Sequence, residues 1–378
     1  MTSTVNLLGL IQGWKFQEKK GSAFYNLFHQ LRFQGNMSEV VDFELPFLVR
    51  KACFLKNISA SKDIWKIKDQ LDVYRYKIAS KYAINAVEEV CEDYNSVIQI
   101  GSNYSISDSE SVRKRDVPLF SFHDNNLSSY AKSIPLALRP KEVVSRAYDF
   151  EKGVYDSLTR VFTMSKTLRK SFIEDFQLPE EKVVYAGFGS IFPVRDVSKK
   201  SYDTRNILFV ASHSFKAKGG QDLVKAFKIA RKSYPSLTLT LVGKDWGINE
   251  PGVSCYGFLD KRNPIDLEIY QKCFEDASIF VLPSYNEAFG EVFIEAMSYG
   301  IPCIGTSCGV MPEIIEGNNA GYVVNRGDIE SLGRLICDLL SSENELKRLG
   351  ASGARAVQSE YQWSTVIRRI CSEVAAFI

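Results

Sequence analysis

The chain of 378 residues is long enough for two domains of ordinary size, and 45% hydrophobic with 24% charged residues is the balance of a globular protein. A formal net charge of +2 indicates no nucleic-acid partner. The eight cysteines contain no C-x-x-C pair and only three histidines are present, so we expect reduced thiols and no zinc site. The first residues lack the basic region of a signal peptide and no run reaches transmembrane length, which predicts a soluble protein, at most attached to a membrane surface.

The first part of the chain alternates apolar runs of strand length with helical patterns. The predicted strands cover residues 5–11, 40–45, 96–100, 118–122 and 160–164. The predicted helices cover residues 24–31, 62–94 as one long helical region or a pair of helices, 144–155 and 165–176, and residues 107–115 read as a polar loop. This alternation predicts a doubly wound α/β domain, although the G-x-G-x-x-G fingerprint of dinucleotide binding is absent. Gly13 ends the first strand and Gly21 precedes the first helix, so the loop between them is expected at the ligand-binding edge.

The helical region 62–94 has an apolar and a basic face. The inward positions are Ile64, Ile67, Leu71, Tyr74 and Ile78, and the basic positions are Lys66, Lys68, Arg75, Lys77 and Lys81. A basic face of this kind is either solvated or lies against anionic lipid headgroups.

His123 directly follows the predicted strand 118–122. The carboxyl ends of parallel strands are where α/β folds place ligands, which favours a functional histidine. The alternative is a histidine that bonds to a loop carbonyl.

The second part repeats the alternation after a polar stretch, residues 193–203, that predicts an interdomain linker. Its predicted strands cover residues 206–211, 237–242, 277–283, 302–306 and 321–324. Helices are expected over 221–233, from 290 onward, from 309 onward and over 329–340, and residues 361–370 predict an amphipathic helix at the end. The loop after the first of these strands carries two lysines and two glycines.

Residues 284–300 read S-Y-N-E-A-F-G-E-V-F-I-E-A-M-S-Y-G and predict a turn followed by a helix start. The first amides of a helix have no intrahelical partner and carry a partial positive charge. The amides of Phe289, Gly290, Glu291 and Val292 therefore predict a seat for phosphate.

Glu287 and Glu295 flank this seat. Because carboxylates repel phosphate, we expect both to accept hydrogen bonds from hydroxyl groups, of a sugar on one side and a ribose on the other. The alternative is an ordinary solvated acidic helix start, with Glu291 and Glu295 on one face.

The central stretch, continued by I-P and followed by G-V-M-P-E-I-I-E-G and A-G-Y-V-V, resembles the donor-binding half of the retaining nucleotide-sugar glycosyltransferases of family four, also known as glycosyl transferases group one. The hallmark of that family is Glu-x7-Glu in this setting. The resemblance covers the second half of the chain densely and the first half thinly. It implies the GT-B fold, in which two Rossmann-like doubly wound domains face a central cleft. Residues 1–195 would form the acceptor-side domain and 204–360 the donor-binding domain, and 361–378 a helix that crosses back to the first domain or closes the second core.

The resemblance also implies site residues. K-G-G at 218–220 matches the segment that supplies an arginine and a lysine to the donor diphosphate, which places Lys218 on the leaving phosphate and Gly219 beside it. The arginine itself is missing, so Lys216 or His213 substitutes for it, or the phosphate clamp is weaker. Phe258 lies in a segment that resembles the one that meets the donor base.

The same resemblance assigns catalytic roles to Lys218, Glu287 and His123, with His123 facing the transferred sugar. Gly13 and Gly21 would belong to an acceptor-side loop.

The implied function is transfer of a sugar from a nucleotide-diphosphate donor to a glycan, lipid-linked or small-molecule acceptor, with retention of anomeric configuration. No D-x-D occurs, so we expect no metal and no other cofactor. The location would be the cytoplasm or the inner face of the membrane, where peripheral contact with lipid remains open. The alternatives are a non-catalytic GT-B subunit that binds a glycan or stabilises a partner transferase, and a GT-B epimerase or phosphorylase.

Overall fold

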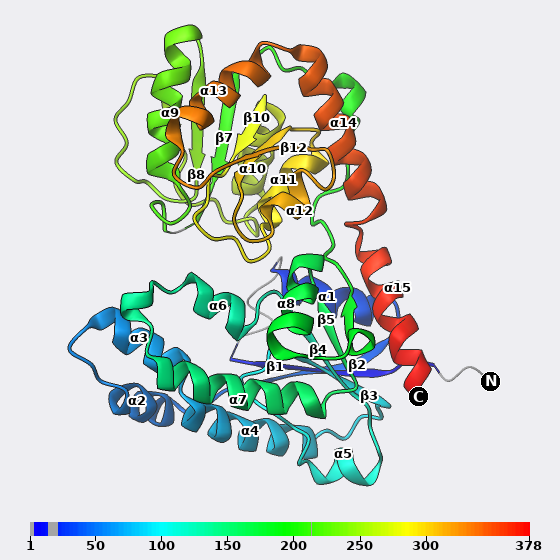
Figure 1. The fold of residues 1–378 in the computed structure, drawn as a ribbon. Coiled ribbons are helices and arrows are strands. Elements are labelled where there is room, and N and C mark those ends of the chain that lie inside the picture. Colours follow the sequence, from blue (N-terminus) through cyan, green and yellow to red (C-terminus); the bar gives the residue numbers. More distant parts are fainter. Residues whose placement is uncertain (1–3, 14–21, 213) are drawn as a thin grey trace. The chain divides into compact units, whose positions relative to one another are not determined.

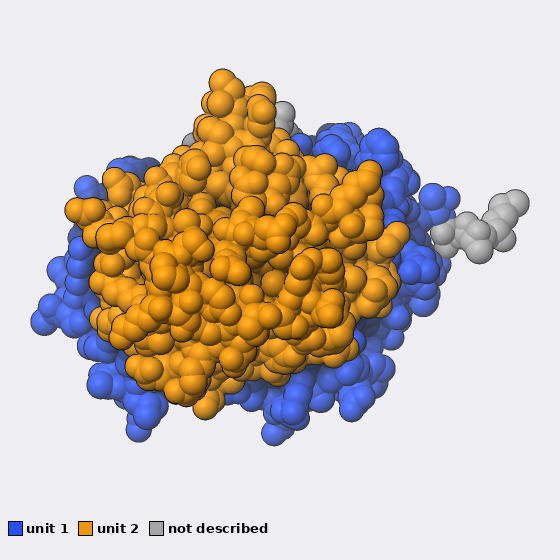
Figure 2. Space-filling model, turned by 90° about the horizontal axis from the view of Figure 1, so that it is seen from above, with its two compact units in different colours: residues 1–188, 363–378 blue, residues 189–362 orange. Residues whose placement is uncertain are grey.

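The computed structural model describes residues 4–13, 22–212 and 214–378 and divides the chain into two compact units (Figure 1). Unit 1 comprises Met1–Phe188 and Trp363–Ile378, and unit 2 comprises Gly189–Gln362; they are blue and orange in Figure 2. Each unit is built on a six-stranded parallel sheet. The α/β class with two doubly wound domains is thereby confirmed.

The sheet of unit 1 has the strand order β2-β1-β3-β4-β5-β6. Its strands are β1 (Leu7–Gln12), β2 (Met37–Phe43), β3 (Ser96–Ile100), β4 (Leu119–His123), β5 (Arg160–Thr163) and β6 (Val183–Tyr185). The order reverses between β1 and β3, and ligands of such sheets bind outside the carboxyl ends of the strands at this switch point.

The helices of unit 1 cover both faces of this sheet (Figure 1). They are α1 (Ala23–Phe33), α2 (Phe47–Lys56), α3 (Lys62–Gln70), α4 (Val73–Glu88), α5 (Glu110–Lys114), α6 (Leu127–Ser133), α7 (Lys141–Ser157), α8 (Lys166–Phe176) and α15 (Trp363–Val374). Helix α1 approaches β1 closely because residue 9 is glycine: a Cβ there would lie 3.3 Å from the Phe28 ring. Helices α4 and α7 pack together with Leu8 and Leu10 of β1 in the core.

Two local expectations for unit 1 are wrong. Residues 107–115 are not a plain loop, because the Ser109 hydroxyl caps α5 by accepting from the Val112 amide. Residues 62–94 contain the pair of helices that the sequence left open beside one long helix, and because the chain breaks before the Asp72 cap, the single inward face assigned to the region is wrong. Tyr74 is consequently 54% exposed, and Tyr76 and Ala79 face the core in its place.

The sheet of unit 2 has the strand order β12-β11-β10-β7-β8-β9. Its strands are β7 (Asn206–Val210), β8 (Thr238–Val242), β9 (Val253–Cys255), β10 (Ile279–Val281), β11 (Cys303–Thr306) and β12 (Gly321–Val324). Its helices are α9 (Gly220–Ser233), α10 (Pro264–Glu275), α11 (Glu291–Ser298), α12 (Met311–Ile315), α13 (Ile329–Leu340) and α14 (Glu343–Ser359). The switch point lies between β7 and β10, so the loops that follow these two strands are neighbours.

The polar stretch 193–203 lies inside unit 2 and not at its border. The Arg195 amide donates to Ser298 O at 2.8 Å, and the Tyr202 hydroxyl donates to Gly300 O at 2.7 Å. The polar composition did not mark a free linker, because backbone carbonyls at the end of α11 accept hydrogen bonds from this segment.

The last helix, α15, belongs to unit 1. The Trp363 ring packs on Phe188 with centroids 5.2 Å apart, and Arg369 donates to Ala186 O at 3.3 Å. The apolar stripe of this helix therefore covers the first core.

Candidate active site

The loops that follow β7 and β10 meet at the switch point of the second sheet. The Tyr285 amide donates to Ala217 O at 2.9 Å, and the Ser284 hydroxyl lies 3.4 Å from the same oxygen. Gly219 has a φ of 73°, and a Cβ at this position would lie 2.0 Å from Pro283 O. Only glycine permits both the conformation and the approach, so the K-G-G loop and the central stretch are held together.

This approach brings Lys218 and Glu287 into contact. Lys218 Nζ lies 2.7 Å from Glu287 Oε2, and the two side chains are 26% and 10% exposed. The Val310 amide donates to Glu287 O at 3.2 Å, so the loop after β11 supports the other side. Sequence reasoning assigns the lysine to a phosphate and the carboxylate to a sugar, whereas in this structure they are each other's partners.

Helix α11 begins at Glu291, directly after Gly290 with a φ of 76°. No side chain caps this helix start, Phe289 and Gly290 are buried, and Val292 is half-buried. A helix start without a side-chain cap attracts an anion through its amides and the helix dipole.

Glu295 lies one turn into α11 and is 2% exposed. Its Oε1 pairs with Lys261 Nζ at 2.6 Å, and its Oε2 accepts from the Tyr270 hydroxyl at 2.6 Å. Burial, followed by the charge of Glu295, raises the pKa of Tyr270 well above its ordinary value, so this hydroxyl is a donor. The solvated acidic helix start is therefore wrong for Glu295, which is held by two partners from other segments.

Lys261 and Tyr270 are site residues that sequence reasoning missed. Lys261 comes from the segment between β9 and α10, and Tyr270 from α10, some 25 or more residues before Glu295 along the chain. Neither belongs to a motif, and only the fold brings them to the carboxylate. The capping Asn263 with Pro264 at the start of α10 was the one local signal that a helix begins there.

The remaining donor-side predictions lie around this core. Lys216 is exposed in the K-G-G loop, and Phe258 is 67% exposed just after β9. His213 lies outside the described residues.

His123 at the end of β4 is packed inside unit 1. It is 2% exposed, its Nε2 lies 2.8 Å from the Ser121 hydroxyl, and Tyr155 and Phe172 contact its ring edge-on. Burial lowers the pKa of His123 to about 3, so the ring is neutral at physiological pH. Besides this strand hydroxyl, the ring makes a backbone hydrogen bond with Asn125 of the following loop, which fits the alternative of a histidine bonded to a loop carbonyl.

The acceptor-side glycines are only partly described. Gly13 ends β1 with a φ of 57°, and its amide donates to Phe43 O at 2.8 Å, at the carboxyl edge of the first sheet. Gly21 lies outside the described residues.

A cavity of about 420 Å³ opens at this edge, and Gln12, His123 and Glu151 are among its lining residues. Glu151 is 5% exposed and accepts from the Leu127 amide at 3.2 Å and the Tyr155 hydroxyl at 2.7 Å. Burial outweighs these hydrogen bonds and raises the pKa of Glu151 to about 7. No sequence motif marks this residue, which the spacing along α7 alone brings inward.

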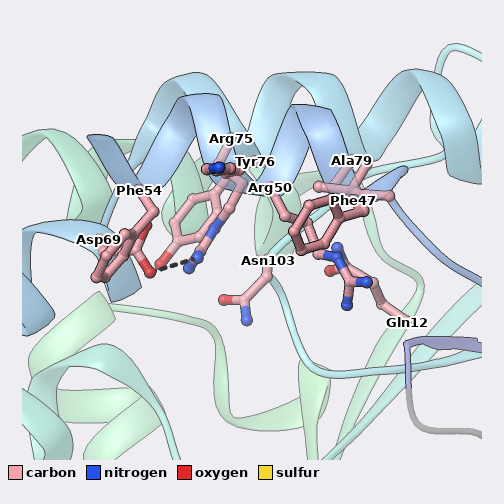
Figure 3. A pocket seen from close by; sticks show the side chains of 11 residues that line it. Gln12, Phe47, Arg50, Phe54, Asp69, Arg75, Tyr76, Ala79 and Asn103 are labelled. Carbon is pink, nitrogen blue, oxygen red and sulfur yellow. Dashed lines mark hydrogen bonds and ion pairs between the residues drawn. The ribbon is translucent and has the colours of Figure 1, made fainter. Parts of the chain in front are cut away.

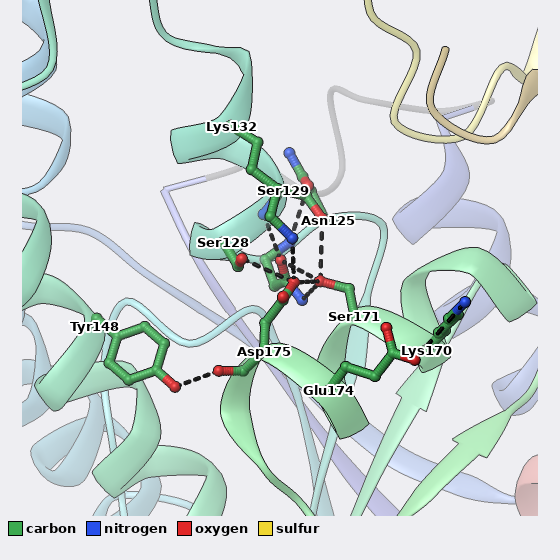
Figure 4. Close-up of polar contacts among 10 residues, drawn as sticks. Asn125, Ser128, Ser129, Lys132, Tyr148, Lys170, Ser171, Glu174 and Asp175 are labelled. Carbon is green, nitrogen blue, oxygen red and sulfur yellow. Dashed lines mark hydrogen bonds and ion pairs between the residues drawn. The ribbon is translucent and has the colours of Figure 1, made fainter. Parts of the chain in front are cut away.

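The segment after His123 is anchored through Asp175 of α8 (Figure 4). Asp175 Oδ2 accepts from the hydroxyls of Ser128 and Ser171 at 2.8 and 2.7 Å and pairs with Lys132 at 2.7 Å. Burial alone would raise the pKa of Asp175, but these donors outweigh it and lower the pKa. Helix α6 is thereby fixed to α8 beside the cavity.

Two properties of the described residues bear on partners. No group of three or more histidine, cysteine or carboxylate side chains gathers there in a way that could hold a metal ion. No helix in the same ranges combines the length and the apolar character that crossing a membrane requires.

Comparison with known proteins adds a family to this geometry. Residues 194–356 match the family described as glycosyl transferases group 1. The chain is 24% identical over 248 residues to a capsular polysaccharide biosynthesis glycosyltransferase, CapM, of Staphylococcus aureus, covering 61% of this chain and 65% of that protein. It is 33% identical over 104 residues to a D-inositol 3-phosphate glycosyltransferase of Streptomyces scabiei, covering 28% of this chain and 23% of that protein. The chain thus spans less than two thirds of the length of these relatives.

Solved structures share the fold over nearly the whole chain. Anabaena Alr3699/HepE, solved with UDP and glucose, superposes with a TM-score of 0.66 at 15% identity and covers 98% of this chain and 100% of that one. A glycosyltransferase from Rickettsia africae superposes with a TM-score of 0.65 at 14% identity, covering 99% of each chain. At such identities the likeness establishes the fold, which is GT-B.

Proposed function

We propose that this chain, whose second unit belongs to the glycosyl transferases of group 1, transfers a sugar from a nucleotide-diphosphate donor to a glycan, lipid-linked or small-molecule acceptor. The observation that carries the proposal is the arrangement at the switch point of unit 2. Two carboxylates with seven residues between them flank a helix start without a side-chain cap, and each is held by a lysine from another segment.

The arrangement suits a donor in three parts. The amides at the start of α11 would meet the diphosphate, Glu287 would orient the sugar and Glu295 the ribose. Lys218 would exchange its partner Glu287 for the charge that develops on the leaving diphosphate, where electrostatic help is worth most.

The absent arginine leaves the second cation of the phosphate clamp to be assigned. Lys216 is exposed and free to turn toward a ligand, whereas Lys261 is engaged with Glu295. We therefore assign the second cation to Lys216, with His213 as the other candidate.

The finer features of the proposal follow the family resemblance. The transfer proceeds with retention of anomeric configuration and needs no metal, because cations and amides do the work of a divalent ion at the diphosphate. We place the protein in the cytoplasm, and at the inner face of the membrane when its acceptor is lipid-borne. The reason is that all eight cysteines lie in the described part of the chain and are free thiols there.

A screen of nucleotide sugars for transfer or hydrolysis tests the proposal, followed by calorimetry of Glu295→Ala with the nucleoside diphosphate of the active donor. We expect binding to weaken about tenfold or more, because a ribose hydroxyl pair loses its acceptor. Glu330→Ala, which removes an exposed carboxylate of the same unit, is the control. Wild-type protein that turns over no nucleotide sugar would leave the non-catalytic subunit as the better assignment, and release of an isomerised nucleotide sugar would identify an epimerase.

A further inference from the structure

A second cavity, of about 620 Å³, lies in unit 1 between α2 and α4 (Figure 3). It shares Gln12, Asn103, Arg75 and Tyr76 with the cavity at His123, so the two are continuous along the carboxyl edge of the first sheet. All residues given for the lining of both cavities belong to unit 1.

One face of α2 forms a wall of this cavity. Phe47, Arg50, Lys51 and Phe54 line it at the spacing i, i+3, i+4, i+7, which places them on one side of a helix. Cys53 is the only buried residue of α2. The lining side chains are therefore not buried in the core of unit 1. Along the helix, two cationic residues lie between two aromatic residues.

The charges of this cavity do not cancel. Arg75 pairs with Asp69 at 3.0 Å, which satisfies one cation with the only carboxylate among the described residues of the lining (Figure 3). Arg50 lies 3.8 Å from Glu44 with both side chains exposed, a pair of little strength. No carboxylate in the described ranges lies within 4 Å of Lys51. Two positive charges remain for a ligand.

Trp65 of α3 supports the Phe54 side of the aromatic wall. The Phe54 ring stacks on Trp65 with centroids 4.2 Å apart, and Trp65 Nε1 donates to Phe54 O at 2.6 Å. The amides of Gln12 and Asn103 supply neutral hydrogen-bonding groups on the other side (Figure 3). Guanidinium and ammonium groups recognise phosphate, and amides beside aromatic rings suit a sugar.

We infer that this cavity binds a phosphate-bearing molecule, with Arg50 and Lys51 on its phosphate. That the molecule is the acceptor rests on the proposed function. The phosphate belongs either to a soluble sugar phosphate or to a lipid headgroup. Leu48, Leu55 and Ile58 stand 75%, 51% and 65% exposed on and just after the same helix, where a bilayer would cover them.

The test is a titration of the full chain with glycerol 3-phosphate and, separately, with vesicles of phosphatidylcholine that do or do not contain phosphatidylglycerol. The fluorescence of Trp65, which stacks on the cavity wall, reports binding, and Trp65→Phe identifies its share of the signal. The double variant Arg50→Gln, Lys51→Gln removes the two charges. The control is Lys141→Gln, Lys170→Gln, which removes the same charge from exposed positions outside the cavity.

We expect the Arg50 and Lys51 variant to bind the phosphate probe about tenfold or more weakly, because a charge-assisted hydrogen bond is lost. The control should stay within about twofold of wild type, as surface charges away from the ligand contribute little. Binding of glycerol 3-phosphate assigns a soluble ligand. Binding only to vesicles with phosphatidylglycerol, lost in Leu48→Ser, Leu55→Ser, assigns a lipid headgroup.

Equal losses in both charge variants, or wild-type protein that binds neither probe, would overturn the inference. Binding of a nucleoside diphosphate distinguishes the cavity inference from the proposed transferase function, because the Arg50 and Lys51 variant should bind it as wild type does. If wild-type protein binds the phosphate probe but turns over no donor, the inference about the cavity stands and the proposed transferase function is refuted.

Discussion

Replacing Gly219 with alanine tests whether the close approach of two loops builds the donor site. The new Cβ would lie 2.0 Å from Pro283 O and 2.6 Å from Pro283 C, closer than real Cβ contacts, so the two loops must separate. The left-handed conformation at a φ of 73° costs about 1 kcal/mol for alanine, and forced separation adds about 1–3 kcal/mol. We expect the free energy of unfolding to fall by about 2–4 kcal/mol in total.

Gly247→Ala is the matched control, because Gly247 has a φ of 64° and nothing lies within 4 Å of the added Cβ. It should lose only the conformational term, about 1 kcal/mol. Urea unfolding of both variants measures the difference, and calorimetry with a nucleoside diphosphate measures the site. Gly219→Ala should also bind the nucleotide more weakly, since Lys218 and Glu287 move with their loops. Equal unfolding free energies for the two variants would refute the steric argument.

Three further expectations concern charge. Lys218→Ala should lower kcat about a hundredfold on the identified donor while Lys216→Ala costs less, and a wild-type kcat for Lys218→Ala would end its role on the leaving phosphate. Because burial raises the pKa of Glu151 from 4.5 to about 7, the native state holds that proton more tightly than the unfolded state, and stability falls as pH rises across this range. Glu151→Gln removes this titration, so the loss in free energy of unfolding between pH 4 and pH 8 should be smaller in the variant than in wild type by on the order of 3 kcal/mol. Equal pH dependence of unfolding in both proteins would contradict this. EDTA should leave turnover intact, and activity lost to EDTA and restored by magnesium or manganese would show that a metal is required.

The fold class and the helix start at which we propose a phosphate seat could both be predicted from the sequence. Apolar runs of strand length alternate with helical patterns in both halves, and a parallel sheet with helices on both faces is the architecture that buries them. The seat was readable because it is local: strand, glycine and helix start follow one another between residues 279 and 298. Helices α2 and α10 are among those that the sequence analysis missed, because α2 buries one residue and shows no clear periodicity, and α10 has a weak one.

Tertiary structure alone decided how the site side chains are partnered. Lys218 and Glu287 are 69 residues apart and Lys261 and Glu295 are 34 apart, and only the strand order that places β7 beside β10 brings the first pair together. His123 illustrates the converse, since its place at a strand end predicted a ligand site, whereas only the fold shows that its ring packs against Tyr155 and Phe172 and also lines a cavity. Side-chain alternation along a strand is a local property, whereas what covers each face depends on helices from elsewhere in the chain.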